Sequence, residues 1–251
     1  MAVLALYSNK GGVGKTATTV NLAYLAAQAG YQTLACDLDP QSSTTYYFRV
    51  QPRLKRSAQG LTTAGKPIAK SIKGSDYPKL DLLPADFSHR NLDITFADLK
   101  RSKERLQKIL EPLRDEYELI FLDCPPTINI LAENIFNAAD FLLVPLPPTT
   151  LAVRAYQQLL DFVTKKKYNP SRVYAFFSMV EPGQKSQRQV AISVYRQFQR
   201  ILKTPIPLRP EVVQMDLHRE PVPAFAPSSA AASAYRNLWL ELQTNLLASN
   251  T

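Results

Sequence analysis

The chain has 251 residues, of which 45% are hydrophobic and 20% are charged, values typical of a globular protein long enough to build one sizeable core. No apolar run approaches the ~20 residues of a membrane span, and the sequence passes from Met1 directly into a strand-like segment without a basic leader. We therefore expect a cytoplasmic protein.

The net charge of +9 is unevenly distributed along the chain. Residues 49–80 contain eight Lys or Arg and one Asp or Glu, and residues 151–251 contain thirteen and six. Residues 81–150 are instead net acidic, with seven Lys or Arg and twelve Asp or Glu. Such segregation is typical of a protein with a polyanionic partner. A solvated basic surface explains the same composition, so charge alone does not decide between the two.

The predicted elements alternate between strands and helices. An apolar strand at 2–7 leads through a glycine-rich turn to a helix at 14–29 and a second strand at 32–36. Residues 42–79 are polar and rich in turn residues, and we interpret them as a surface excursion with a short helix, basic over 49–79. The remaining elements are a strand at 80–83, a helix at 100–113, a strand at 117–126 that stops at a carboxylate and two prolines, a strand at 139–146, a helix at 150–165, a strand at 172–180, and helices at 186–202 and 227–247.

Unbroken apolar strands separated by helices predict an α/β fold, with one mostly parallel, twisted sheet covered by helices on both faces. No internal repeat and no second domain is evident, so we expect the whole chain to form a single domain. In such sheets ligands bind at the carboxyl ends of the strands, where Lys10, Asp39 and Asp123 are expected to converge. Cys36 and Cys124 lie in apolar runs and are interpreted as small buried side chains, not as disulfide or metal ligands.

The segment "YSNKGGVGKTATT" at 7–19 is a glycine-rich turn between the first strand and the first helix. Such a turn directs several backbone N–H groups toward one point, where the helix dipole adds partial positive charge. It predicts a phosphate site in which Lys15 reaches the β- and γ-phosphates and Thr16 offers its hydroxyl to Mg²⁺. Asn9 stands where the strict phosphate-loop pattern has glycine, and a second lysine, Lys10, precedes the loop. The glycines that allow close backbone approach are Gly11, Gly12 and Gly14.

Two aspartates follow predicted strands. Asp39 lies in "CDLDPQ" at 36–41, and Asp123 ends the apolar run of "LIFLDCPP" at 119–126. A carboxylate at the end of a buried strand is where a magnesium-side ligand is expected in a phosphate-transfer site. Either aspartate alone is explained equally well as a strand-end cap, but together with the glycine loop they indicate a nucleotide site.

This set of motifs resembles the ParA/MinD family of deviant Walker A ATPases, which are P-loop NTPases. The segments "LLPADF", "NAADFLLVPL" and residues 205–238 also resemble that family, most closely its small ParA-type partition proteins. The resemblance covers the whole chain and is weakest over 49–79 and 181–200. It implies an ATPase that uses ATP and Mg²⁺.

The resemblance also implies a role for each motif residue. Lys10, Lys15 and Asp39 act in catalysis: Lys10 reaches across a nucleotide-sandwich dimer to the partner's phosphates, and Asp39 orients the attacking water. Asp37 supports the same loop. The expected metal-site residues are Thr16, Asp37, Asp39 and Asp123. The expected nucleotide contacts are Lys10, Gly11, Gly12, Val13, Gly14, Lys15, Thr16 and Ala17, with Met179, Val180, Pro205 and Pro207 at the adenine.

The sequence departs from the family pattern at three places. Ala17 replaces a usual threonine, which removes a hydroxyl contact to the α-phosphate. Ser42 and Ser43 replace the usual Gly-Asn after "DPQ". The loop after "VPL" reads "PPTTLAV" where partition proteins carry an acidic-aromatic stretch. These departures bear on the rate and on the partner surface.

Within the family, the favoured reading is a nucleoid-associated positioning ATPase. Its ATP-bound homodimer binds double-stranded DNA nonspecifically and is released when a ParB-like or cargo-adaptor protein stimulates hydrolysis. That partner is expected to dock near the dimer seam, on the helix at 150–165, whereas the basic excursion at 49–79 is read either as a DNA or partner contact or as a solvated loop. The candidate DNA contacts are Arg209, Arg219, Arg236, Lys165, Lys166 and Lys167.

Two alternatives stay open. A membrane-bound, MinD-like ATPase needs a basic amphipathic tail, but the C-terminal "NLWLELQTNLLASNT" has no Lys or Arg after Arg236. A metabolic relative, such as an amide-forming ligase or an iron–sulfur reductase, shares the phosphate loop. The ligase is not excluded by motif, whereas the reductase needs cysteines that this chain does not place suitably. The sequence does not identify what such an ATPase would position, whether a plasmid, a chromosome region or a protein assembly.

Overall fold

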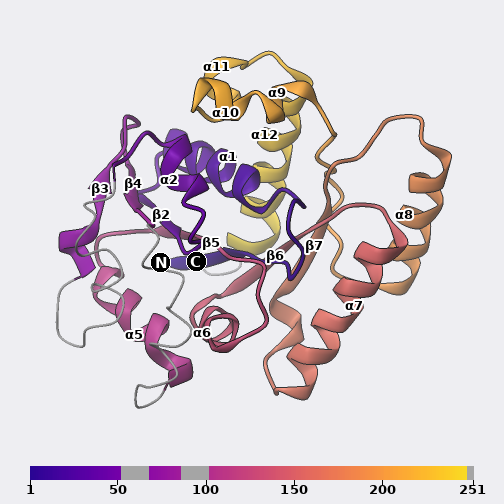
Figure 1. The fold of residues 1–251 in the computed structure, drawn as a ribbon, viewed down its shortest axis with the longest axis horizontal. Coiled ribbons are helices and arrows are strands. Elements are labelled where there is room, and N and C mark those ends of the chain that lie inside the picture. The colour runs from indigo at the N-terminus through magenta and orange to yellow at the C-terminus, as the bar shows by residue number, and fades with distance from the viewer. Residues whose placement is uncertain (52–67, 86–101, 248–251) are drawn as a thin grey trace.

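A seven-stranded sheet runs through the computed structural model, which describes residues 1–51, 68–85 and 102–247 (Figure 1). The strand order is β3-β4-β2-β5-β1-β6-β7. All neighbouring strands are parallel except β3, which is antiparallel to β4. The strands are β1 (Ala2–Leu6), β2 (Thr33–Asp37), β3 (Lys73–Gly74), β4 (Leu80–Leu83), β5 (Leu119–Asp123), β6 (Phe141–Leu146) and β7 (Val173–Phe177).

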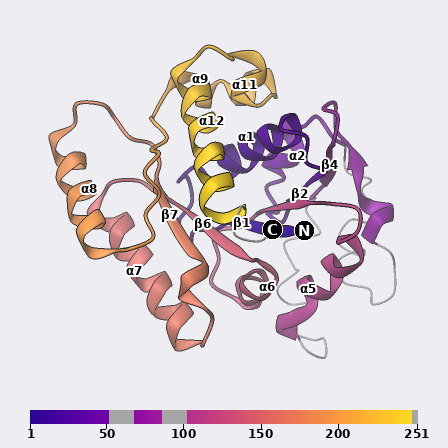
Figure 2. The same cartoon turned by 180° about the vertical axis from the view of Figure 1, so that it is seen from behind.

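Helices cover both faces of the sheet, as Figures 1 and 2 show from opposite sides. In β1, Val3 and Ala5 belong to one buried cluster and Leu4 and Leu6 to the other, because successive side chains of a strand point to opposite faces. The first cluster is completed by α5 (Arg105–Leu110), α6 (Ile130–Ala138), α7 (Thr150–Lys165) and α8 (Lys185–Gln197). The second is completed by α1 (Lys15–Gln28), α11 (Val222–Phe225) and α12 (Ala230–Leu242).

The predicted fold class is confirmed, and two predicted elements have the observed bounds. β4 and α7 begin and end where the sequence predicts them. None of the helices in the described parts of the chain combines the length and apolar character needed to cross a membrane. Four short helices were not predicted: α6, α9 (Pro210–Val213), α10 (Met215–His218) and α11.

Three of the predicted helices need correction. The helix predicted at 186–202 is wrong beyond α8, because the chain there pairs with β7: the Ala175 N–H donates to the Arg200 carbonyl at 2.9 Å, and the Leu202 N–H donates to the Ala175 carbonyl at 2.7 Å. The described part of the helix predicted at 100–113 consists of α5 flanked by two 3₁₀ turns. The last helix begins at Ala230 and ends in one π-helical turn, Gln243–Leu247.

The short helix expected within 42–79 is present as α2 (Ser43–Tyr47), but the expected surface position is wrong for it. Thr44 and Thr45 of α2 are buried against the ends of β2 and β5. The basic residues at 52–67 lie outside the described part of the chain.

A buried asparagine joins α11 to α1. Asn21 is fully buried, its amide N–H donates to the Ala17 carbonyl at 2.7 Å, and its carbonyl oxygen accepts the Val222 N–H at 2.8 Å. This contact places the segment of α9, α10 and α11 beside the middle of α1.

We expect Asn21→Ala to lower the free energy of unfolding by about 2 kcal/mol, because it leaves the buried Val222 N–H without an acceptor. Urea denaturation measures the change. The matched control is Asn137→Ala, which removes an exposed bond to the Lys103 carbonyl and should cost less than about 1 kcal/mol. Equal losses in the two variants would contradict the interpretation.

Candidate nucleotide site

The phosphate loop connects the end of β1 to the start of α1. Gly12 and Gly14 have φ angles of 69° and 95°, in the region that L side chains rarely adopt. Gly14 caps α1 without a side-chain hydrogen bond. The first N–H groups of a helix have no intrahelical acceptor, so this loop presents backbone donors to an anion.

A cavity of about 680 Å³ opens beside this loop, within the range of ~300–1,000 Å³ that small-molecule sites occupy. Loops following β1, β2, β5 and β7 line it, at the carboxyl edge of the sheet where ligands of such folds bind. Residues 125–127 and 206–209 complete its walls.

Most residues predicted to contact the nucleotide lie together in this cavity. Those that line it are Gly11, Gly12, Val13, Gly14, Lys15, Thr16, Ala17, Met179 and Pro207, and Asp39, predicted as a catalytic residue, lines it too. Val180 and Pro205 do not line it, although Val180 pairs with Pro207 across a parallel bridge. Arg209, Val212 and Val213 also line the cavity and were not predicted to do so.

Lys10 lies outside the cavity. It lines a separate small recess, with Pro145, Pro147 and Ala152. The two lysines of the motif therefore line different cavities.

Lys15 is buried, with 7% of its surface exposed, and its ammonium donates to the Lys10 carbonyl at 3.0 Å. Burial lowers the pKa of Lys15, while Asp123, Cys124 and Asp39 act in the opposite direction. The described residues give this buried ammonium one hydrogen bond. An anion placed beside it would therefore be strongly stabilised.

Asp37 is fully buried at the end of β2 and organises the loop that follows it. Its Oδ2 accepts the Thr45 N–H at 2.8 Å and the Thr45 hydroxyl at 2.7 Å, and its Oδ1 accepts the Asp39 N–H at 3.2 Å. Burial, and then the nearby Asp123, raise the pKa of Asp37. Through these bonds Asp37 positions the backbone that carries Asp39 into the cavity.

Asp123 is fully buried at the end of β5, and the described residues give a hydrogen bond to one of its two carboxylate oxygens. Its Oδ2 accepts the Thr44 hydroxyl at 2.8 Å, whereas its Oδ1 is buried without a donor among the described residues. Burial raises its pKa, opposed by the hydroxyls of Thr44 and Thr16 and by Lys15.

These residues fit a magnesium ion. Within the described ranges no group of three or more His, Cys, Asp or Glu could hold a metal ion, but Mg²⁺ beside a nucleotide needs only one or two protein oxygens in addition to phosphates and waters. The unpartnered Asp123 Oδ1 and the Thr16 hydroxyl supply such oxygens. There Mg²⁺ would neutralise phosphate charge.

Sequence reasoning missed Thr44 and Thr45, which hold the two buried carboxylates. The signal was the run "SSTTYY", read as surface because it is polar. Buried carboxylates need hydrogen-bond donors, so two aspartates predicted at strand ends should have directed attention to the hydroxyls a few residues downstream.

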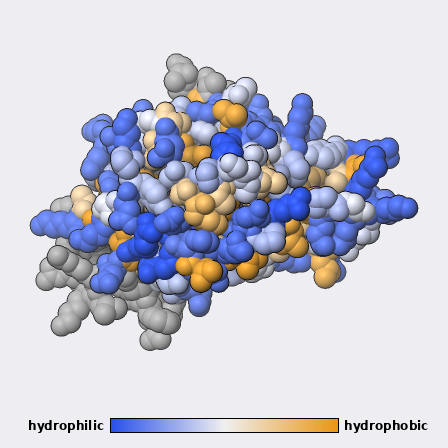
Figure 3. All heavy atoms as spheres, turned by 90° about the horizontal axis from the view of Figure 1, so that it is seen from above, coloured by the Kyte–Doolittle hydropathy of each residue, from blue (hydrophilic) through white to orange (hydrophobic). Residues whose placement is uncertain are grey.

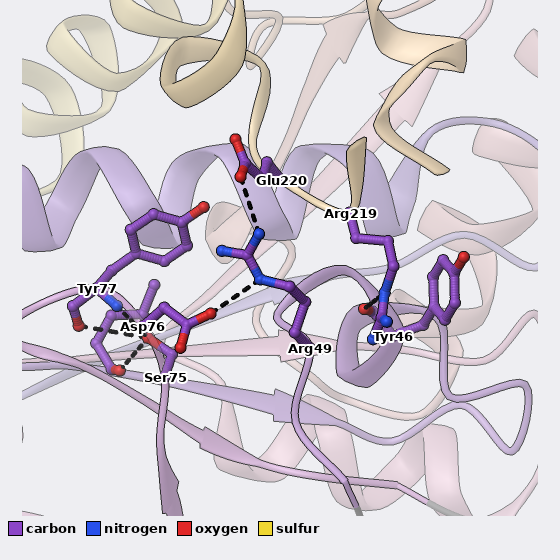
Figure 4. Close-up of polar contacts among 8 residues, drawn as sticks. Tyr46, Arg49, Ser75, Asp76, Tyr77, Arg219 and Glu220 are labelled. Atoms are coloured by element: carbon purple, nitrogen blue, oxygen red, sulfur yellow. Dashed lines mark hydrogen bonds and ion pairs between the residues drawn. The ribbon is translucent and has the colours of Figure 1, made fainter. Parts of the chain in front are cut away.

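The six candidate DNA contacts do not form one surface. Arg209 lines the nucleotide cavity, and Arg219 stacks on the Tyr46 ring at 4.4 Å (Figure 4). Arg236 donates to the Pro227 carbonyl at 2.7 Å. Lys165, Lys166 and Lys167 lie at the end of α7.

The three lysines are remote from the nucleotide cavity, because α7 starts at the carboxyl edge of the sheet and returns to the amino edge. Among them, Lys166 forms an ion pair with Glu133 at 3.2 Å. Several of the six cations are therefore used within the chain.

The family described as an AAA domain matches residues 1–172. The sporulation initiation inhibitor protein Soj of Bacillus subtilis is 27% identical over 249 residues, which cover 97% of this chain and 98% of Soj. The chromosome partitioning protein ParA of Caulobacter vibrioides is 28% identical over 250 residues, covering 96% of this chain and 94% of ParA.

Solved structures share the fold. Apo McdA of Cyanothece superposes with a TM-score of 0.85 at 20% identity, covering 96% of this chain and 99% of McdA. Cobyrinic acid a,c-diamide synthase of Mycobacterium smegmatis with bound ADP and magnesium superposes with a TM-score of 0.82 at 24% identity, covering 98% of this chain and 96% of the synthase. The family match, together with the phosphate loop and the relatives that span nearly the whole chain, shows that this protein belongs to the ParA-type family of AAA-domain ATPases.

Proposed function

We propose that this chain is a partition or positioning ATPase that binds ATP with Mg²⁺, hydrolyses it to ADP and phosphate, and changes its assembly state with each turnover. The observation that carries the proposal is the cavity of about 680 Å³, which combines the phosphate loop, the buried Lys15 ammonium and Asp39. Its lining also includes Met179, Pro207 and Val212, which suit an adenine base. The ParA relative is named as a chromosome partitioning protein.

The ATP-bound form is proposed to be a homodimer. Lys10 lies outside the chain's own cavity, which leaves its ammonium to serve a second subunit. A γ-phosphate buried between two subunits needs more positive charge than one lysine supplies. Hydrolysis would then weaken the dimer, slowly until a ParB-like or cargo-adaptor protein stimulates it.

The proposed DNA-bound, nucleoid-associated state needs a cationic surface, and α8 offers one. Lys185, Arg188 and Arg196 are exposed, lie on one face of this helix by their spacing, and have no ion pair among the described residues. Residues 182–210 contain six Lys or Arg and no acid. Figure 3 shows the end of the molecule formed by α8 as mainly hydrophilic. The nearest acid in sequence, Glu181, is hydrogen-bonded to Gln187.

We expect binding to random-sequence duplex DNA only with ATP or a non-hydrolysable analogue, and we expect it to fall steeply with salt as counterions are released. Reversing the three α8 charges to glutamate should weaken binding at least about tenfold and reduce the slope of log K against log salt by about three. Fluorescence anisotropy at several KCl concentrations measures both quantities.

The matched control reverses Lys165, Lys167 and Arg172, at the amino edge of the sheet. A larger loss there would place DNA on the end of α7 instead of on α8. No DNA binding in any nucleotide state would contradict this part of the proposal and direct the assay to anionic vesicles and then to ligase substrates.

A further inference from the structure

The short helix α2 is held by side-chain contacts at both of its ends. It has five residues, and isolated helices shorter than ~12–15 residues are marginal in water. Its position therefore depends on tertiary contacts.

The inner end of α2 contacts the two buried carboxylates. Thr44 donates to Asp123 at 2.8 Å, and Thr45 donates to Asp37 at 2.7 Å while its hydroxyl oxygen accepts the Ala85 N–H at 3.0 Å. Thr44 is fully buried and Thr45 is 2% exposed. Because one Asp123 oxygen is taken by Thr44, the orientation of the other oxygen follows the position of α2.

The outer end of α2 is fixed by Arg49 (Figure 4). Arg49 has a left-handed backbone with φ of 57°, and its guanidinium donates to Asp76 through Nε and to Glu220 through Nη1, each at 2.8 Å. The turn that carries Asp76 is itself held by the Ser75 hydroxyl, which donates to the Leu80 carbonyl at 2.6 Å. Arg49 thus connects the end of α2 to the β3–β4 turn and to the loop before α11.

Arg219 contacts the same helix from the opposite side (Figure 4). It also has a left-handed backbone, with φ of 54°, and its Nε donates to the Tyr46 carbonyl at 3.1 Å while its guanidinium lies 4.4 Å from the centre of the Tyr46 ring. In return, the Tyr46 hydroxyl donates to the Asp216 carbonyl at 3.3 Å. We call Tyr46, Arg49, Asp76, Arg219 and Glu220 the α2 anchor.

The α2 anchor joins two parts of the nucleotide site without touching the nucleotide cavity. Its five residues are absent from the cavity lining, but the segment to which it ties α2 supplies Val212 and Val213 to that lining. The same segment is bound to α1 through Asn21 and Val222. A movement of α9–α11 would therefore reach Asp123 through α2.

We propose that α2 is a strut that sets the orientation of Asp123 toward the metal of the bound nucleotide, with Thr44 as the positioning residue and the α2 anchor fixing the strut. This inference rests on the proposed binding of a magnesium nucleotide, but not on DNA binding or dimer formation. Through α2, a contact on the surface of the α9–α11 segment would change the orientation of Asp123.

The first test compares Thr44→Val with Thr44→Ser. Valine keeps the size but leaves Asp123 Oδ2 without its donor, and serine restores the hydroxyl. We expect Thr44→Val to weaken Mn²⁺ binding to the ADP complex roughly tenfold, as is usual when a residue that orients a metal ligand is lost. Electron paramagnetic resonance of free Mn²⁺ measures the affinity. ADP affinity in EDTA should be unchanged, and serine should recover most of the Mn²⁺ affinity.

The second test removes one side chain of the α2 anchor, that of Arg219. Arg219→Ala should weaken Mn²⁺ binding about threefold, the size expected for a partly exposed contact, although this side chain does not line the cavity. If the anchor acts through Thr44, the double variant with Thr44→Val should bind Mn²⁺ no more weakly than Thr44→Val alone. The matched control is Arg114→Ala, which loses a partly exposed ion pair with Glu111 of 2.9 Å.

The outcomes separate this inference from the proposed function. If the unaltered chain binds no ADP or ATP, both are overturned. If it binds nucleotide and Thr44→Val, with normal thermal melting, retains full Mn²⁺ affinity, only the strut is overturned. It is also overturned if serine fails to restore the affinity, if the double variant is multiplicative, or if Arg114→Ala equals Arg219→Ala.

Discussion

Lys15→Ala should abolish nucleotide binding. The ammonium of Lys15 is buried beside the loop that presents backbone N–H groups, and its hydrogen bond within the chain goes to a carbonyl of that same loop. A phosphate therefore replaces a weak neutral acceptor with a charged one, in a place where water does not compete. Removing the ammonium should weaken ATP and ADP binding at least about 100-fold.

Isothermal titration calorimetry with MgADP and with a non-hydrolysable ATP analogue measures this loss. The matched control is Lys79→Ala, since the Lys79 ammonium also donates to a backbone carbonyl, that of Gly30 at 2.8 Å, but far from the cavity in the fold. The control should bind both nucleotides normally. Tight binding by Lys15→Ala would show that the loop N–H groups alone hold the phosphates.

The parts of the fold that were predicted correctly have strong local signals. The strand at 80–83 is a short apolar run between two prolines, and the helix at 150–165 has a clear helical periodicity, so both can be recognised locally. The phosphate loop was recognised because few backbone geometries need glycines and a lysine at this spacing. Those signals lie within one stretch of the chain.

The features that were missed depend on contacts between distant segments. α2 is polar in sequence, and its threonines become buried because Asp37 and Asp123 need donors. Arg209 is a candidate DNA contact by resemblance, and its place in the wall of the cavity, just before α9, was not predicted. Composition alone does not reveal which cation meets a carboxylate, a ring or a ligand.

Asp39→Ala should separate binding from chemistry, which Lys15→Ala does not do. Asp39 lines the cavity, and its Oδ1 accepts the Gln41 N–H at 2.9 Å, so its role in the folded chain is a turn contact at the mouth of the site. If its carboxylate orients the attacking water, as we propose, the variant should still bind ATP while turnover falls at least about 100-fold, the usual size of such a contribution. The ATP-bound dimer should then accumulate.

Phosphate release and gel filtration in ATP measure the two effects in one preparation. Asp39→Asn separates the turn contact from the carboxylate charge, because its side-chain oxygen can still accept the Gln41 N–H while the charge is lost. If Asp39 acts on water, Asn should be as inactive as Ala, and both should remain dimeric in ATP. Recovery of turnover by Asn would mean that the turn, not the carboxylate, matters. Because Asp37 holds the Asp39 N–H from a buried position, the reacting geometry would then reside in that backbone contact and not in the side chain that faces the nucleotide.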